Sequence, residues 1–150
     1  MAFPDPQPGL VIRYAYLWRS EAERDREEGG KDRPCAVVLA TKRGPEGKTT
    51  VVVAPITHSP PQDPKTAIEI PDAMKARLGL DDTRSWIVTN DLNYFVWPGS
   101  DVRPVNPRKP EQGIAYGYLS QHITQRLISE VRDRMREGQT KAVPRDAPER

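Results

Sequence analysis

The sequence has 150 residues, enough for one compact domain and too few for two ordinary ones. Its net charge of +2 is too small by itself to indicate a nucleic-acid-binding protein. No apolar stretch approaches the roughly 18 residues of a membrane span, and the first residues lack the pattern of a signal peptide. The single cysteine and two distant histidines exclude an intramolecular disulfide and give no metal-ligand spacing. We therefore expect a cytoplasmic protein that needs no metal or cofactor.

The 16 prolines, about twice the usual share, divide the chain. Proline interrupts helix interiors and central strands, so regular structure is expected in the three windows without it, residues 9–33, 72–97 and 111–143. We predict an extended amino-terminal arm over residues 1–8, one domain over 9–138 and a flexible tail over 139–150.

Runs rich in β-branched and aromatic residues predict short strands. In chain order these are Leu10–Trp18, Cys35–Thr41, Thr49–Ile56, Ala67–Ile70, Trp86–Thr89 and Tyr94–Trp97, with another beginning at Val102. The second and third are joined by KRGPEGK, whose glycines and proline predict a hairpin. The strongly charged residues 19–33 predict a solvated loop with a marginal helical turn, or alternatively a flap over a site.

Two helices are expected. Pro71 begins a short one that ends at Gly79, and Ser120 is a good N-cap for a longer amphipathic helix that ends at Gly138. The longer helix has apolar residues at helical spacing, namely Ile123, Leu127, Ile128, Val131 and Met135. Five or six short strands followed by a packed helix predict a mainly-β protein of the α+β class, arranged as a small β-barrel.

The candidate site lies at strand ends. Arg33 begins the second predicted strand and Thr57-His58 ends the third, so antiparallel pairing brings them to the same edge of the sheet. A guanidinium, a hydroxyl and an imidazole suit RNA cleavage without a metal, in which the 2′-OH attacks the phosphorus and needs a base, an acid and a cation. Arginine is a permanent cation, and histidine exchanges protons near neutral pH. Each residue also has a plain structural interpretation, as a surface charge, a strand end or a solvated loop.

The order of these segments resembles the MazF/PemK/Kid family of toxins. The resemblance extends from about Gly9 to Arg136 and rests on Arg33-Pro34 before CAVVLA, followed by VVVAPIT, IEIP, SWIVTNDLNYF and YGYLSQHITQRLISEVRDRM. It implies a CcdB/MazF-type barrel related to SH3 folds, usually as a homodimer. It also implies metal-independent, sequence-specific cleavage of single-stranded RNA (mRNA), inhibition by a cognate antitoxin, and growth arrest.

By this resemblance, Arg33 matches the family's catalytic arginine and Thr57 its catalytic threonine. We add His58 as a candidate proton carrier, because a threonine hydroxyl is a poor base by itself.

We interpret Asn90, Asp91 and Asn93 as candidates for base or ribose contacts, since single-stranded RNA is read at exposed base edges. Many family members instead carry an acidic residue, a glutamine, any residue and an arginine at this point, and the arginine is missing here. That departure favours an alternative function, a non-catalytic module of the same fold that binds a protein partner or nucleic acid. The three tryptophans, Trp18, Trp86 and Trp97, either stack on bases or fill the core.

Overall fold

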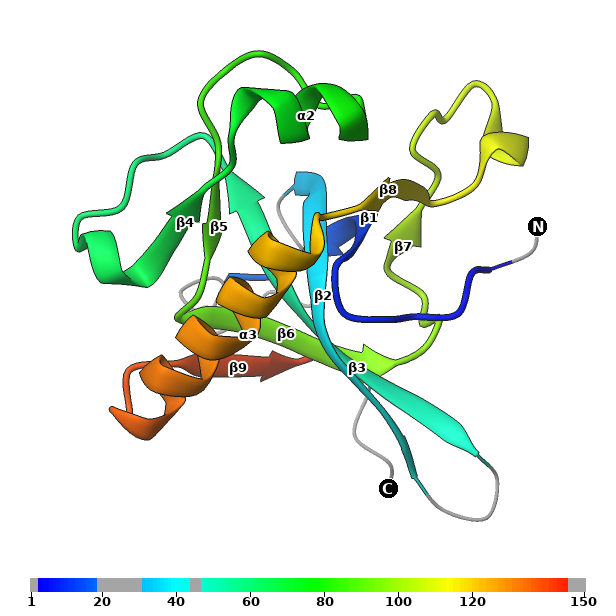
Figure 1. The fold of residues 1–150 in the computed structure, drawn as a ribbon. Coiled ribbons are helices and arrows are strands. Elements are labelled where there is room, and N and C mark those ends of the chain that lie inside the picture. Colours follow the sequence, from blue (N-terminus) through cyan, green and yellow to red (C-terminus); the bar gives the residue numbers. More distant parts are fainter. Residues whose placement is uncertain (1–2, 19–30, 44–46, 146–150) are drawn as a thin grey trace.

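The computed structural model describes residues 3–18, 31–43 and 47–145 (Figure 1). Within these ranges the chain forms nine strands and two α-helices, so the mainly-β, α+β class predicted from the sequence is confirmed. The strands are β1 (Leu10–Tyr16), β2 (Lys31–Arg43), β3 (Lys48–Thr57), β4 (Ala67–Glu69), β5 (Trp86–Val88), β6 (Asp91–Val96), β7 (Val102–Arg103), β8 (Ala115–Tyr118) and β9 (Lys141–Pro144). The helices are α2 (Asp72–Leu78) and α3 (Gln121–Arg136).

The sheet runs in the order β4-β5-β3-β2-β1-β7, with β8 also paired to β1 and β6 paired to both β3 and β9. Every pair is antiparallel except β6–β9, which is parallel. The strand pairs of the described residues form an open sheet, and none of these pairs closes the sheet into the predicted barrel. The long hairpin of β2 and β3 extends as an arm beyond the rest of the sheet (Figure 1).

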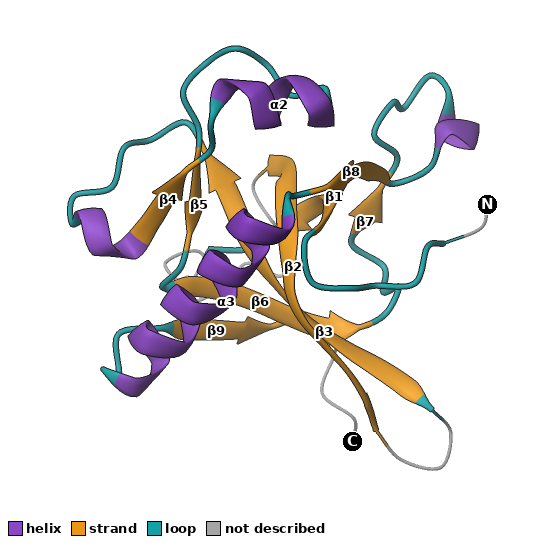
Figure 2. Ribbon diagram, in the orientation of Figure 1, coloured by secondary structure: helices purple, strands orange, loops and turns teal. Residues whose placement is uncertain are grey.

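Apolar side chains on alternate positions pack on the two faces of the sheet, as strand geometry requires. In β1, Leu10, Ile12 and Tyr14 belong to one cluster of buried residues, whereas Val11 belongs to the other. The cluster that contains Val11 lies between the sheet and the two helices (Figure 2). It receives Met74 and Leu78 from α2 and, from α3, Ile123, Leu127 and Val131.

Both predicted helices are confirmed, together with the residues that limit them. The Ser120 hydroxyl accepts a hydrogen bond from the Ile123 N–H at 3.3 Å, which caps the first turn of α3. Helix α2 ends at Gly79, whose φ of 70° lies in the left-handed region that favours glycine. Neither helix in the described ranges has the length and apolar character that a bilayer span requires.

Two predictions differ from the structure at its edges. The prediction of a flexible tail is wrong for residues 141–144, because they pair with β6 as strand β9 and bury Val143. Residues 19–30 of the predicted charged loop lie outside the described residues. Residues 31–33, the last part of that predicted loop, form the beginning of strand β2. In both places the segment forms a strand because it pairs with a neighbouring strand, which the local sequence alone does not predict.

Candidate active site

Strands β2 and β3 separate from each other beyond the pair formed by Cys35 and Pro55. Arg33 and Thr57 are the residues two positions further along on each strand. Proline has no N–H to donate, and Pro34 and Pro55 both lie where the shared ladder stops.

Beyond this point β2 remains paired with β1, while β3 pairs with β5. Arg33 pairs with Tyr14 of β1, while Thr57 pairs with Trp86 of β5. The divergence leaves two pockets between the strand ends. One, which we name the Trp18 pocket, has a volume of about 350 Å³ and is lined by Trp18, Arg33, Thr57, Ser59, Pro60, Pro61, Thr66, Ala67 and Val88.

The second pocket, which we name the His58 pocket, has a volume of about 280 Å³ and is lined by Lys31, Asp32, Arg33, Pro34, Ile56, Thr57, His58, Leu80, Asp81 and Ser85. Arg33 and Thr57 line both pockets and therefore lie between them. The three residues singled out in the sequence, Arg33, Thr57 and His58, are thus brought together around the His58 pocket.

Arg33 is half-buried, and one of its hydrogen-bond donors, Nε, finds no acceptor among the described residues. Its guanidinium carbon lies 5.1 Å from the centre of the Trp18 ring, within the range of a cation–π interaction. Its Nε is shielded from solvent and has no hydrogen-bond partner among the described residues. The nearby carboxylate of Asp32 faces Arg13, at 3.5 Å, and Arg103, at 4.0 Å. A shielded donor without an acceptor is costly, so an incoming anion would satisfy it.

Thr57 and His58 are both tied to neighbours. The Thr57 hydroxyl oxygen accepts a hydrogen bond from the Ser59 N–H at 3.1 Å, which leaves its own proton to donate. His58 Nε2 lies 3.1 Å from Asp81 Oδ1, and Asp81 in turn accepts from the Thr83 N–H. Successive side chains of a strand point to opposite faces, but β3 ends at Thr57. His58 lies outside the strand, so this rule does not separate the two side chains. Asp81 was not found from the sequence, because it follows His58 by 23 positions in no recognisable pattern.

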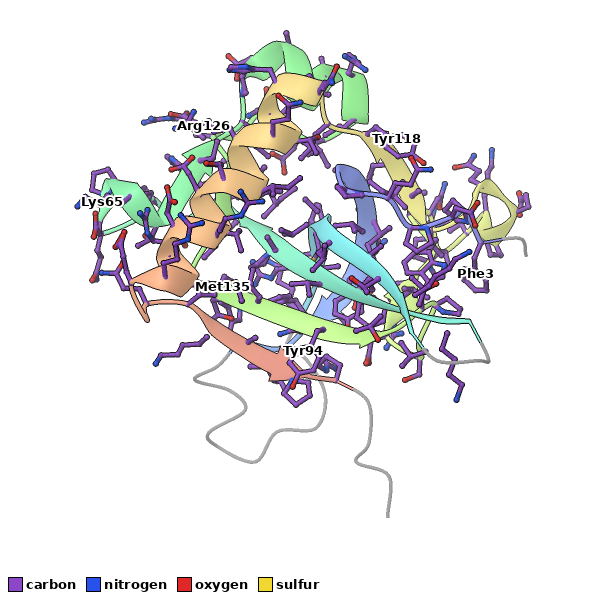
Figure 3. All side chains as sticks on the ribbon, turned by 60° about the horizontal axis from the view of Figure 1, so that its bottom comes forward. Phe3, Lys65, Tyr94, Tyr118, Arg126 and Met135 are labelled. Atoms are coloured by element: carbon purple, nitrogen blue, oxygen red, sulfur yellow. The ribbon has the colours of Figure 1, made fainter. Side chains whose placement is uncertain are left out.

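The predicted RNA contacts on β6 lie elsewhere. Asn93 is fully buried; its amide donates to the Leu17 carbonyl at 2.7 Å and accepts from the Leu17 N–H at 2.9 Å. The prediction of Asn93 as an RNA contact is therefore wrong, because its polar atoms already serve the backbone of the chain. The next residue, Tyr94, is exposed on the other face of the strand (Figure 3).

Asp91 and Asn90 line neither pocket. The Asp91 carboxylate accepts a hydrogen bond of 2.6 Å from the Tyr16 hydroxyl. Burial first, and then the Asp91 charge, raise the pKa of Tyr16 well above its ordinary value. Asn90 is half-buried in the turn between β5 and β6, where its carbonyl accepts from the Lys141 N–H.

Cys35 lies beside the candidate site but belongs to the core. It has no exposed surface, and burial raises the pKa of its thiol despite the opposing influence of Arg33. No group of three or more His, Cys, Asp or Glu residues with metal-binding geometry occurs in the part of the chain that the structure describes. The chemistry at hand is that of a cation, a hydroxyl and an imidazole–carboxylate pair.

Fold and site together define a mainly-β protein whose diverging strands hold an arginine and a threonine between two pockets. A family model described as PemK-like, MazF-like toxin of type II toxin-antitoxin system matches residues 16–95, more than half of the chain. The chain belongs to this family of toxins. No curated protein and no solved structure matches it.

Proposed function

We propose that this protein is a growth-inhibiting endoribonuclease that cleaves single-stranded mRNA at particular sequences without a metal ion. The observation that carries the proposal is the shielded Nε of Arg33, which has no hydrogen-bond partner in the part of the chain that the structure describes and lies in the pocket walls that Arg33 shares with Thr57. Family membership supports a toxin inhibited by a cognate antitoxin, and with it a homodimer that acts in the cytoplasm.

In the proposed reaction the 2′-oxygen of the substrate bonds to phosphorus and the bond to the 5′-oxygen breaks. The products are a 2′,3′-cyclic phosphate and a 5′-hydroxyl. Arg33 stabilises the charge that builds on the phosphoryl oxygens, and Thr57 donates a hydrogen bond to one of them. His58 carries a proton between the reacting oxygens, and Asp81 orients its ring through the 3.1 Å contact.

A second candidate function is a binding module that holds RNA or a protein partner without cutting it. It is favoured by the stretch Asn90-Asp91-Leu92-Asn93, which lacks the arginine common in the family. The Asp91 side chain accepts from Tyr16, and the Asn93 side chain binds the Leu17 backbone. Asn90 is the one residue of this stretch that we still propose as an RNA contact.

The test is cleavage of a long mixed-sequence RNA in EDTA by the wild-type protein and by Arg33→Ala, Thr57→Ala and His58→Gln. Removal of a charge-stabilising donor costs about 10²–10³-fold in rate, which we expect for Arg33→Ala and Thr57→Ala. We expect about 10²-fold for His58→Gln.

Arg126→Ala is the matched control, because Arg126 is an exposed arginine of α3 away from the pockets (Figure 3). Equal rates for Arg33→Ala and Arg126→Ala would remove Arg33 from the mechanism. A wild-type protein that binds RNA and leaves it intact would establish the binding module instead.

A further inference from the structure

The Trp18 pocket has the composition of a site for a flat, apolar ring. Its apolar walls are the indole of Trp18, the rings of Pro60 and Pro61 and the aliphatic side chains of Ala67 and Val88, and polar side chains complete the lining. Its volume of about 350 Å³ lies at the lower end of the usual range for small-ligand pockets, about 300–1,000 Å³. Among the described residues, Arg33 is the one charged side chain that lines it.

The pocket is joined to the proposed phosphate site through shared walls. Arg33 and Thr57 belong to both, and the Arg33 guanidinium packs against the Trp18 ring at 5.1 Å. A phosphate held by Arg33 and Thr57 thus has the pocket immediately beside it. In a polynucleotide, the group that lies one sugar away from a phosphate is a base.

We propose that the Trp18 pocket holds the nucleobase adjacent to the phosphate bound by Arg33 and Thr57. Trp18 binds this base by stacking, the common way in which aromatic side chains hold unpaired bases. Because every base presents a π-face and the pocket walls are mainly apolar, binding here is tolerant of base identity. The inference rests on the proposed function for the substrate class, and it adds a subsite to it.

Binding is measured with a probe that cannot be cut, a 2′-O-methyl oligonucleotide of uridine and a second one of adenosine. Stacking on an aromatic side chain contributes about 1–3 kcal/mol per base, so Trp18→Ala should weaken binding of both probes by roughly 5- to 150-fold. Trp18→Phe keeps an aromatic ring and should retain most of the affinity. In this Trp18→Phe variant, the probe should no longer quench the tryptophan fluorescence.

Trp97→Phe is the matched control. Trp97 stacks on Phe95 at 6.2 Å and lines neither pocket, so this variant should keep both affinity and quenching. Unchanged affinity in Trp18→Ala, or a loss confined to one of the two probes, would overturn the proposal. Trp18→Ala that cuts RNA more slowly but binds the probes normally would also overturn it, because Trp18 would then only position Arg33.

The two proposals fail separately. Wild-type protein that cleaves RNA, with a Trp18→Ala variant of unchanged probe affinity, retains the nuclease and removes the subsite. Wild-type protein that binds the probes through Trp18 and leaves RNA intact removes the nuclease and retains the subsite.

Discussion

Asn93 is the residue whose substitution tests most directly how the site is supported. It lies on β6 with no exposed surface, and its side-chain amide forms two hydrogen bonds with the backbone of Leu17. Leu17 is itself 5% exposed and immediately precedes Trp18, which lines the Trp18 pocket. Asn93 therefore fixes the point at which the chain leaves β1 for the site.

The magnitude of the Asn93→Ala effect follows from what it leaves unpaired. The N–H and C=O of Leu17 would lose their partners, and an unsatisfied buried group costs about 1–3 kcal/mol. The expected loss is about 2–6 kcal/mol of unfolding free energy, a large part of the about 5–15 kcal/mol typical of a domain. A water that enters the space would move the value towards the lower end.

The assay is urea unfolding followed by circular dichroism, with Asn90→Ala as the control. Asn90 is half-buried in the preceding turn, and its main-chain carbonyl, which the substitution leaves in place, accepts from the Lys141 N–H. Its substitution should therefore change the unfolding free energy by less than about 0.5 kcal/mol. Equal midpoints and slopes for Asn93→Ala and Asn90→Ala would refute this account of Asn93.

Three further predictions concern the buried polar groups. Arg145→Ala should lower the unfolding free energy by about 3–5 kcal/mol, because the largely buried carboxylate of Asp101 would lose the cation that lies 3.0 Å from it. A loss below about 1 kcal/mol in urea unfolding would contradict this prediction. Because the pKa of Tyr16 is raised, the unfolded chain releases the hydroxyl proton above about pH 10 while the folded protein keeps it, and the unfolding free energy falls as the pH rises further. The difference in unfolding free energy between wild type and Tyr16→Phe should therefore narrow from about pH 9 to about pH 11. A constant difference would contradict this prediction. Cys35 should react with a thiol reagent on the order of 10³-fold or more slowly in native protein than in urea, since only unfolding exposes it; rapid native labelling would show that the core opens locally.

The amino-acid sequence by itself determined the elements whose signals are local. The β-branched runs placed β2 and β3, and the glycines and proline between them announced a hairpin. Ser120 and Gly79 marked a helix start and a helix end, because capping depends on neighbouring backbone groups. Arg33 and Thr57 could be named as a pair, since hairpin register follows from the positions of two adjacent strands.

Tertiary structure alone decided which polar groups serve the fold and which face the site. Asn93 has the same side chain as a typical RNA contact, but its partner, Leu17, is 76 positions away in the sequence. Strand β9 has few apolar residues and forms because it pairs with β6 through backbone hydrogen bonds. Asp81 contacts His58 although 23 positions separate them in the sequence. Hydrogen bonds between distant residues depend on how strands assemble, and no local pattern encodes that assembly.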